Sequence, residues 1–437
     1  MSGSVSVPGP GGSTITQTFS NSFNSQLAQS ISKALQDAQA AGTLTVTSAT
    51  SSGLAPPPAS GSPGDNELFV TLAPNGTVTV PAGYGYVVDN STGPDTIFGS
   101  PGQQILVGPG QHTIIDPTSV VLSDSAFGVV TLTGVGDVVA AGNGAATVNA
   151  KGANESVLGG AGTLFANITG SASGDTVVGG PGAVFATVSG SFAVVQGGDG
   201  ALAATVSGSG DTISGGGGKM SVLVTGSSDT INAGVSSTFV TTTGGSFVRG
   251  NSGPLNFVGG AGPSTIFDAS GSSTVFGSEG FTSIVGAAGG VTTYVNTTSG
   301  GLTYVAGAGN ETIDASLSKT GAWLQGGTGQ NLLVGGAGAD GLAAGSGAGT
   351  IVGGGGANVF YFFKAEGGPT AQDVISDFSA IDHVALVNYG AGEAVAAIAG
   401  ATTSGGSTTI TLSDNTKITF TGVTNVASIA GQIVSVS

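Results

Sequence analysis

The sequence predicts an all-β chain folded as a β-solenoid, or parallel β-roll, with nine- and eighteen-residue periods, a short N-terminal helix and a C-terminal β cap. From Gly326 to Tyr361 the chain divides into four glycine-rich nonamers: GGTGQNLLV, GGAGADGLA, AGSGAGTIV and GGGGANVFY. Each nonamer carries an apolar residue at its eighth place. These residues are Leu333, Leu342, Ile351 and Phe360. Glycine turns also recur eighteen residues apart, at Gly179, Gly197 and Gly215. Turns and single inward side chains at a fixed period are typical of stacked β-coils.

The N-terminal segment, residues 1–50, contains the one helix that the first half of the sequence indicates. Residues 1–18 are expected to be flexible. From Phe19 to Ala41, the apolar residues Phe23, Leu27, Ile31 and Leu35 recur every four positions and Gly42 can end the helix. Two interpretations stay open for this helix. It either caps the end of the solenoid or serves as an interaction or polymerisation helix.

The rest of the chain divides by composition. Residues 43–50 alternate like a strand, and the proline-, glycine- and serine-rich stretch 51–66 is interpreted as a linker. The solenoid is predicted over 67–361, with two strands in 67–88 and about fifteen coils from residue 90 onward. Residues 362–437 lose the glycine period, and strands over 373–378, 381–389 and 407–423 are expected to form a β cap, because a β-stack needs its end strands covered.

Composition excludes several classes of partner. Seven basic residues face 24 acidic ones, for a net charge of -17, so nucleic acid and anionic membrane surfaces are poor partners and divalent cations are better ones. The chain has no cysteine, and its first residues lack the basic and apolar regions of a Sec signal peptide. No apolar run is long enough to predict a transmembrane segment. These features fit either a cytosolic protein or one exported by another route.

Acidic residues recur at the sixth place of the nonamers and predict a column of stacked carboxylates. Stacked carboxylates repel one another unless cations or protons neutralise them, and calcium takes six to eight oxygen ligands. Asp340 is the strongest candidate ligand, with Asn331 and Asn358 as weaker oxygen donors. The remaining candidates are Asp95, Asp137, Glu155, Asp175, Asp211, Asp229, Glu311, Asp373 and Asp377. The alternative is that each carboxylate accepts hydrogen bonds from nearby backbone in a turn and binds no metal.

Unit 335–343 resembles the repeat GG-x-G-x-D-x-U-x, with Leu342 as the apolar U, of the RTX family of secreted calcium-binding β-roll proteins. NSTGPDTIF and VSGSGDTIS match its second half, and DVISDF, IDHVALVNYG and SDNTKITFTGV are similar to the C-terminal tail of such proteins. The resemblance covers roughly residues 90–437, with most coils degenerate. It implies calcium as the cofactor, an uncleaved C-terminal signal, type I secretion and folding outside the cell.

The sequence does not predict an enzyme. His112 and His383 lie far apart, and no zinc helix or nucleophile elbow is present. Tyr294, Tyr304 and Arg249 are the other residues that could assist a lyase, and their spacing does not bring them together. We expect an extracellular structural protein that forms a surface layer, matrix or filament, or mediates adhesion, with a homo-oligomer as the main assembly. The alternative is a secreted module for a cell-surface glycan or ice, suggested by threonines at 241–243 and 292–293.

Overall fold

The computed structural model describes residues 3–19, 22–59, 61–115, 118–122, 126–169, 174–287, 292–295, 300–364 and 371–436. The chain is nearly all β, with about 17 turns of parallel β-solenoid and 8% helix, so the predicted fold class is confirmed. It forms two compact units, Met1–Thr225 and Gly226–Ser437, and each is described by itself. No described helix is both long and apolar enough to cross a bilayer.

Unit 1 stacks its strands into two parallel sheets, and each strand pairs with the strand one coil later. The odd sheet contains β3 (Thr45–Ala49), β5 (Asn66–Val70), β7 (Tyr86–Asp89), β9 (Gln104–Val107), β11 (Ser119–Leu122), β13 (Val138–Ala140), β15 (Ser156–Leu158), β17 (Thr176–Val178), β19 (Val194–Gln196) and β21 (Thr212–Ser214). The even sheet contains β4 (Gly53–Leu54), β6 (Gly76–Thr79), β8 (Asp95–Phe98), β10 (Gly110–Ile115), β12 (Ala126–Leu132), β14 (Ala146–Ala150), β16 (Leu164–Ile168), β18 (Val184–Ser189), β20 (Leu202–Ser207) and β22 (Met220–Val224).

Unit 2 repeats this arrangement. Its odd sheet contains β23 (Asp229–Asn232), β25 (Ser246–Arg249), β27 (Ser264–Phe267), β29 (Thr282–Val285), β31 (Leu302–Val305), β33 (Trp323–Gln325), β35 (Gly341–Ala343), β37 (Val359–Phe363), β39 (His383–Val387) and β43 (Ile433–Val436). Its even sheet contains β24 (Thr238–Thr242), β26 (Leu255–Val258), β28 (Ser273–Phe276), β30 (Thr292–Val295), β32 (Thr312–Asp314), β34 (Asn331–Val334), β36 (Gly349–Val352), β38 (Gln372–Ile375), β42 (Lys417–Thr421), β41 (Ser407–Thr411) and β40 (Thr402–Ser404).

Alternation along each strand builds a thin interior of stacked apolar side chains. Successive strand residues point to opposite faces, so residues at one register position form a straight file through the coils. The eighth-place residues Leu333, Leu342, Ile351 and Phe360 are all buried, as the period predicts. Glycine is required where turns stack closely. A Cβ added to Gly198, for example, would clash with the carbonyl oxygen of Gly180 one coil earlier.

The predicted linker is part of the solenoid. Strand β3 pairs with β5, and the short β4 pairs with β6, so residues 45–59 form the first coil, and the predicted start at residue 67 is wrong. The proline-rich composition hid this coil because Pro56, Pro57 and Pro58 follow β4 almost directly, in the corner of the coil. Tyr84 donates its hydroxyl to the carbonyl oxygen of Pro56 at 2.9 Å and ties this corner to the next coil.

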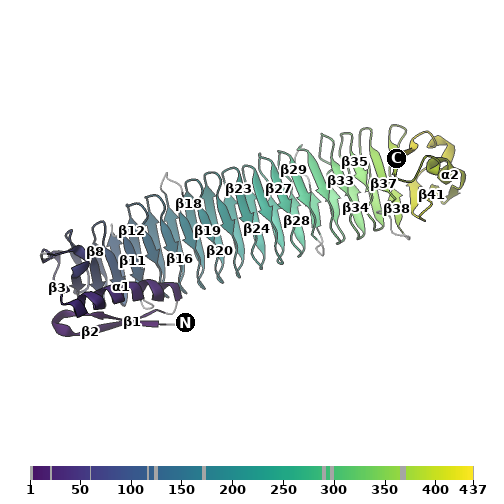
Figure 1. The fold of residues 1–437 in the computed structure, drawn as a ribbon. Helices are drawn as coiled ribbons and strands as arrows, with labels where there is room; N and C mark the ends of the chain where they lie inside the picture. The colour runs from purple at the N-terminus through teal and green to yellow at the C-terminus, as the bar shows by residue number, and fades with distance from the viewer. Residues whose placement is uncertain are drawn as a thin grey trace. The chain divides into compact units, whose positions relative to one another are not determined.

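The N-terminal segment folds onto a face of the odd sheet in unit 1. Residues Gly3–Pro8 (β1) and Thr14–Phe19 (β2) form an antiparallel hairpin, although the sequence predicted a flexible segment there. Helix α1 (Ser22–Ala41) packs against the hairpin and runs alongside the first coils (Figure 1). Its buried Ile31 and Leu35 share an apolar cluster with residues on the outer side of the odd sheet: Phe69, Val88, Leu106, Val121 and Ala140. The helix therefore covers a side of the stack rather than its end.

The C-terminal residues of unit 2 extend the stack and then close it. Strands β38 and β39, predicted as cap strands, continue the two parallel sheets, and β42 and β43 add one more rung to each. After β42 the even sheet turns antiparallel through β41 and β40. Helix α2 (Glu393–Ala399) packs beside β41 and β43 (Figure 1). The remaining short helices are 3-10 turns at Pro10–Gly12, Pro63–Asp65 and Val426–Ser428.

Candidate functional site

The predicted acidic column is divided between the two sheets. In unit 1, Asp137, Glu155, Asp175 and Asp211 stand at one register position of the odd sheet, with Ala193 on the rung between Asp175 and Asp211. Asp95 lies in the even sheet of that unit. In unit 2, Asp229, Asp340 and Asn358 belong to the odd sheet, and Glu311, Asn331 and Asp373 follow one another through the even sheet, with Gly349 on the rung between the last two. No single file contains all of them.

These side chains point into the solenoid. Every candidate ligand except Asp377 is buried, and Asp377 is exposed. Asp340 is buried and Asp377 is exposed, but both accept hydrogen bonds from backbone N–H groups of glycine turns. Asp377 accepts the backbone N–H groups of Gly353 at 2.7 Å and Gly354 at 2.8 Å, and Asp340 accepts that of Gly336 at 2.7 Å. Asp340 and Asp377 therefore both use their oxygens to accept backbone N–H groups.

A repeated hydrogen bond links several rungs of the odd column to the rung before them. Asp340 Oδ1 accepts the backbone N–H of Ala322 at 2.7 Å, and Asn358 Oδ1 accepts that of Asp340 at 3.0 Å. Asp382 then accepts the N–H of Asn358 at 2.9 Å. In unit 1 the same contact joins Asp211 to the N–H of Ala193 at 2.8 Å and Asp175 to the N–H of Glu155 at 3.0 Å. The column is thus a side-chain ladder that satisfies buried backbone donors.

The even sheet of unit 2 carries a second ladder of this kind. Asn331 Oδ1 accepts the N–H of Glu311 at 3.1 Å, and Asp373 Oδ1 accepts the N–H of Gly349 at 2.9 Å. Asparagine and aspartate make the same contact in both ladders, so the geometry uses an acceptor oxygen and does not require a charge. This arrangement supports the alternative that the sequence left open, in which the acidic residues serve the backbone.

Burial raises the pKa of several of these carboxyl groups to neutral pH or above. Burial and the charges of Asp137 and Asp175 raise the pKa of Glu155 to about 8. Burial also raises the pKa of Glu311 and of Asp373, each to about 7. Glu311 Oε2 and Asp373 Oδ2 have no hydrogen-bond partner among the described residues. At a pH below these values, protons supply part of the neutralisation that a stacked acidic column needs.

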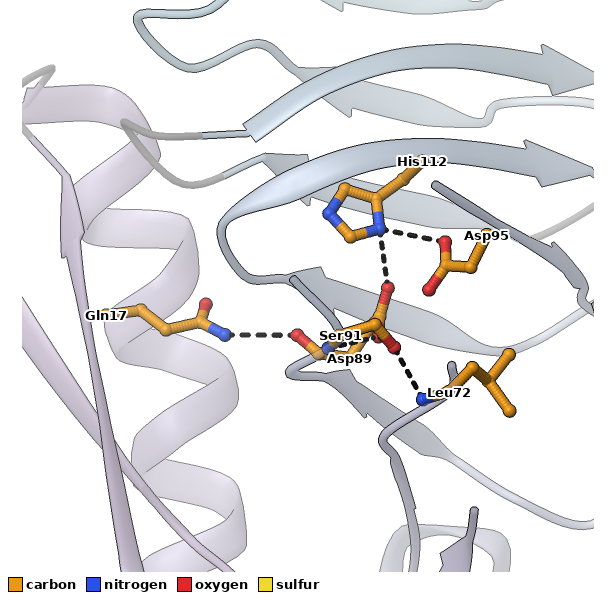
Figure 2. Close-up of polar contacts among 6 residues, drawn as sticks. All are labelled: Gln17, Leu72, Asp89, Ser91, Asp95 and His112. Atoms are coloured by element: carbon orange, nitrogen blue, oxygen red, sulfur yellow. Dashed lines mark hydrogen bonds and ion pairs between the residues drawn. The ribbon is translucent and has the colours of Figure 1, made fainter. Parts of the chain in front are cut away.

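An Asp–His–Asp cluster lies in the interior of unit 1 and was not predicted. His112 Nδ1 lies 2.8 Å from Asp89 Oδ2 and 2.9 Å from Asp95 Oδ1, and none of the three side chains is exposed (Figure 2). Asp89 ends β7 in the odd sheet, whereas Asp95 and His112 are neighbours in the even sheet. Asp89 Oδ1 also accepts the N–H and hydroxyl of Ser91. The cluster therefore joins the two sheets across a corner of the coil.

The cluster is held together as an ion pair. Burial alone would lower the pKa of the His112 imidazole, but hydrogen bonds and charges from Asp89 and Asp95 outweigh it and raise the pKa to about 9. His112 is then a cation at neutral pH, with one carboxyl oxygen of each aspartate within 2.9 Å of its Nδ1. Burial also raises the pKa of Asp89, against the opposing effect of His112. Gln17 of the N-terminal hairpin donates to the backbone oxygen of Asp89 at 3.4 Å, which connects the hairpin to this corner (Figure 2).

The described acidic and histidine residues form one cluster of three possible ligand atoms, and its chemistry does not suit calcium. Among them, Asp89, Asp95 and His112 form the sole set of three acidic or histidine ligand atoms within 4.8 Å of one another. One of these atoms is an imidazole nitrogen, whereas calcium takes oxygen ligands. In the ladders, one oxygen of Asp340, Asp175 or Asp373 already accepts a backbone N–H. Calcium binding stays a prediction that a titration must test.

Sequence reasoning missed four buried ionisable groups besides His112, one of which is Asp382 of the odd-sheet ladder. Glu67 is fully buried on β5, and burial raises its pKa to about 8. Asp268 follows β27 and accepts the hydroxyl of Thr292. Asp89 lies six residues before Asp95, and a corner of the coil separates them. The nine- and eighteen-residue periods therefore do not predict that they meet. The 17-residue spacing of Asp95 and His112, close to one coil, is the signal that could have identified that pair.

The sequence also singled out two tyrosines, one arginine and two threonine runs, and the structure shows where each lies. Tyr294 and Tyr304, which were not expected to meet, lie with ring centroids 6.5 Å apart, but both are buried in the interior of unit 2. Arg249 stacks on the ring of Phe247 on the outer side of β25. Thr242 and Thr292 point inward and are buried. Thr293 faces outward, and it stands in one file of the even sheet with Thr274 and Thr312, so part of the predicted threonine column is present.

No family model matches this chain, and no curated protein matches it either.

Proposed function

We propose that this protein is an extracellular structural protein whose solenoid contributes to a surface layer or matrix through an outer sheet face. The observation that carries the proposal is the outer face of the even sheet in unit 1. Uncharged side chains repeat there in register on successive strands: Thr131, Asn149, Asn167, Thr187 and Thr205. Neighbouring rungs lie one strand spacing apart, about 4.8 Å. A regular face of this kind suits a partner with a repeat of its own, such as a second copy.

An aromatic pair strengthens this face. Phe165 and Phe185 lie in the next outward row, and their rings stack with centroids 5.1 Å apart. Phe165 and Phe185 are each nearly half exposed, at 44% and 46%. Exposed apolar groups that sit together, rather than singly, commonly mark contact surfaces. Burying this pair against another molecule would stabilise the contact.

The charge distribution favours contact through such a face. The candidate acidic residues point into the stack, apart from Asp377, so the net charge of -17 is not concentrated on the strands that carry the Thr and Phe rows. We do not propose an enzyme, because the described Asp–His–Asp cluster is fully buried and can reach no substrate. The RTX-like repeats support an extracellular setting, and the proposal uses no step that depends on calcium.

The test is whether the protein associates through the even-sheet face. We expect the purified chain to form oligomers or sheets at high concentration, measured by analytical ultracentrifugation and electron microscopy with and without calcium. Phe185→Asp places a charge in the face and should abolish this association. Val194→Asp is the matched control, because Val194 is 40% exposed on the odd sheet of the same unit. A wild type that remains monomeric, or a Phe185→Asp variant that still associates, contradicts the proposal.

A further inference from the structure

A polar groove crosses four successive strands of the even sheet in unit 2. It has a volume of about 410 Å³ and is lined by residues of β32, β34, β36 and β38 and of the turns before them: Asn310, Glu311, Thr312, Gln330, Asn331, Leu332, Ala348, Gly349, Thr350, Gln372 and Val374. The strands pair in register, Thr312 with Leu332, Leu332 with Thr350 and Thr350 with Val374. The groove is therefore a feature of the regular sheet and not of a loop.

The hollow exists because a small residue, Ala348, interrupts a row of longer outward side chains. Asn310, Gln330 and Gln372 precede the ladder residues of their coils, and Ala348 takes that place in the coil between the two glutamines. Gly349 then stands where Asn331 and Asp373 carry side chains. A Cβ on Gly349 would lie 3.4 Å from its nearest neighbours, an ordinary contact, and its φ is not in the left-handed region. The backbone does not demand a glycine here, and the position faces inward, so the outward gap between Gln330 and Gln372 is left by Ala348.

The chemistry of the lining is neutral and suits hydroxyl groups. The exposed carboxamides of Gln330 and Gln372 flank the gap, and each offers both donors and an acceptor. The described residues supply no hydrogen-bond partner to either of these two side chains. Thr312 and Thr350 add hydroxyls, and the half-buried Leu332 and Val374 provide apolar surface beside them. The one acidic residue of the lining, Glu311, is 1% exposed, and its Oε1 accepts the N–H of Gly307.

We propose that this groove binds a neutral saccharide, with the carboxamides on its hydroxyls and Leu332 and Val374 against its C–H face. The volume lies in the range of pockets that hold small ligands, roughly 300–1,000 Å³. An anionic sugar would meet no basic side chain in the lining and would approach a chain of net charge -17, so the ligand is uncharged. The long sheet on either side leaves room for the rest of a polysaccharide chain.

The experiment is calorimetric titration of the full chain with cellotetraose, laminaritetraose and N-acetylchitotetraose, with an oligogalacturonate as the charged control and calcium chloride alone as a probe for a cation. We expect at least one neutral tetrasaccharide to bind. Ala348→Gln fills the gap with the residue type of the neighbouring rungs and should weaken that binding at least tenfold. The matched control is Ala337→Gln, at an exposed turn outside the groove.

A second variant, Gln330→Ala with Gln372→Ala, removes exposed side chains and keeps the inference testable if Ala348→Gln disturbs the fold. It should also weaken binding at least tenfold. The inference is overturned if no neutral tetrasaccharide binds, if the oligogalacturonate or calcium alone occupies the groove instead, or if both variants bind like the wild type. A chain that associates through Phe185 but binds no sugar overturns this inference alone, since the groove and the assembly face lie in different units.

Discussion

Asp340 accepts a hydrogen bond from the backbone N–H of Ala322, the residue at the same place one coil earlier, at 2.7 Å. The same contact recurs between Asn358 and Asp340 and between Asp382 and Asn358. A buried N–H without an acceptor costs about 1–3 kcal/mol, so each rung stabilises the stacking of one coil on the next. The sixth-place residues of the repeat hold the coils together whether or not they also bind a metal.

Substitution of Asp340 tests this role. Asp340→Ala removes the acceptor of both Ala322 and Gly336, and we expect a loss of about 2–5 kcal/mol in the free energy of unfolding. Asp340→Asn keeps an acceptor oxygen and should lose less, about 1–2 kcal/mol. Urea unfolding in EDTA measures both losses. The same measurement is repeated with calcium. If both variants lose the same free energy of unfolding, and lose it only when calcium is present, Asp340 is instead a calcium ligand.

The buried carboxyl group of Glu67 should make the free energy of unfolding depend on pH. Its pKa is raised by burial to about 8 from an ordinary 4.5, and neither carboxyl oxygen has a hydrogen-bond partner among the described residues. Ionisation is therefore costlier in the folded state, and the stability present at pH 4–5 is lost as the pH rises through about 8. Glu67→Gln removes this titration. We expect the variant to unfold at a higher urea concentration than the wild type at pH 9, and at a similar one at pH 5.

The control for this experiment is Glu279→Gln, which removes an exposed carboxyl group from unit 2. It should leave the difference between pH 5 and pH 9 unchanged. If Glu67→Gln behaves like this control, the burial of an unpaired carboxyl at Glu67 is not what makes the fold sensitive to pH.

Substitution of His112 measures how much the buried ion pair contributes to the free energy of unfolding. His112→Asn leaves Asp89 and Asp95 in the interior without their cation, and we expect a loss of about 3–5 kcal/mol at pH 6. The folded-state pKa of about 9 exceeds the ordinary 6.5, so the stabilisation is complete below pH 6.5 and disappears as the pH rises through 9. The difference between wild type and variant should shrink accordingly in urea unfolding at pH 9.5.

A triple variant separates charge from shape in this cluster. Replacing Asp89, Asp95 and His112 together by asparagine removes all three charges, and the protein should recover part of the stability that His112→Asn loses. A triple variant that is less stable than His112→Asn at pH 6 would mean that packing, and not the uncompensated carboxylates, sets the cost.

Leu35 tests the docking of α1. Its side chain is fully buried in the cluster with Leu106 and Val121, so Leu35→Ala should cost about 2–5 kcal/mol. Because the helix covers the side of unit 1, we expect faster hydrogen exchange in α1, β1 and β2 and little change in β18 or β20. Gln39→Ala, on the exposed side of the helix, is the matched control. Unchanged exchange in Leu35→Ala would show that the helix does not depend on this contact.

The periodic part of the fold was predictable, and the aperiodic part was not. The eighth-place residues, such as Leu342 and Phe360, identify the interior because each coil must bury one residue there. The first coil was missed because Pro56–Pro58 resemble a linker, although a corner of a β-coil also accommodates prolines. The residues of the ladder were identified from spacing alone, whereas their acceptor role was not, because spacing cannot tell which backbone donor a side chain reaches.

The prolines of the first coil have a consequence for behaviour at high concentration. A proline has no backbone N–H, so a strand of another molecule that approaches beside Pro56, Pro57 and Pro58 finds no donors with which to extend a cross-β ladder. A stack of parallel strands is otherwise a ready template for amyloid growth. The proline corner therefore offers no donors to an incoming strand at that place, whereas β3, the other strand of the first coil, contains no proline.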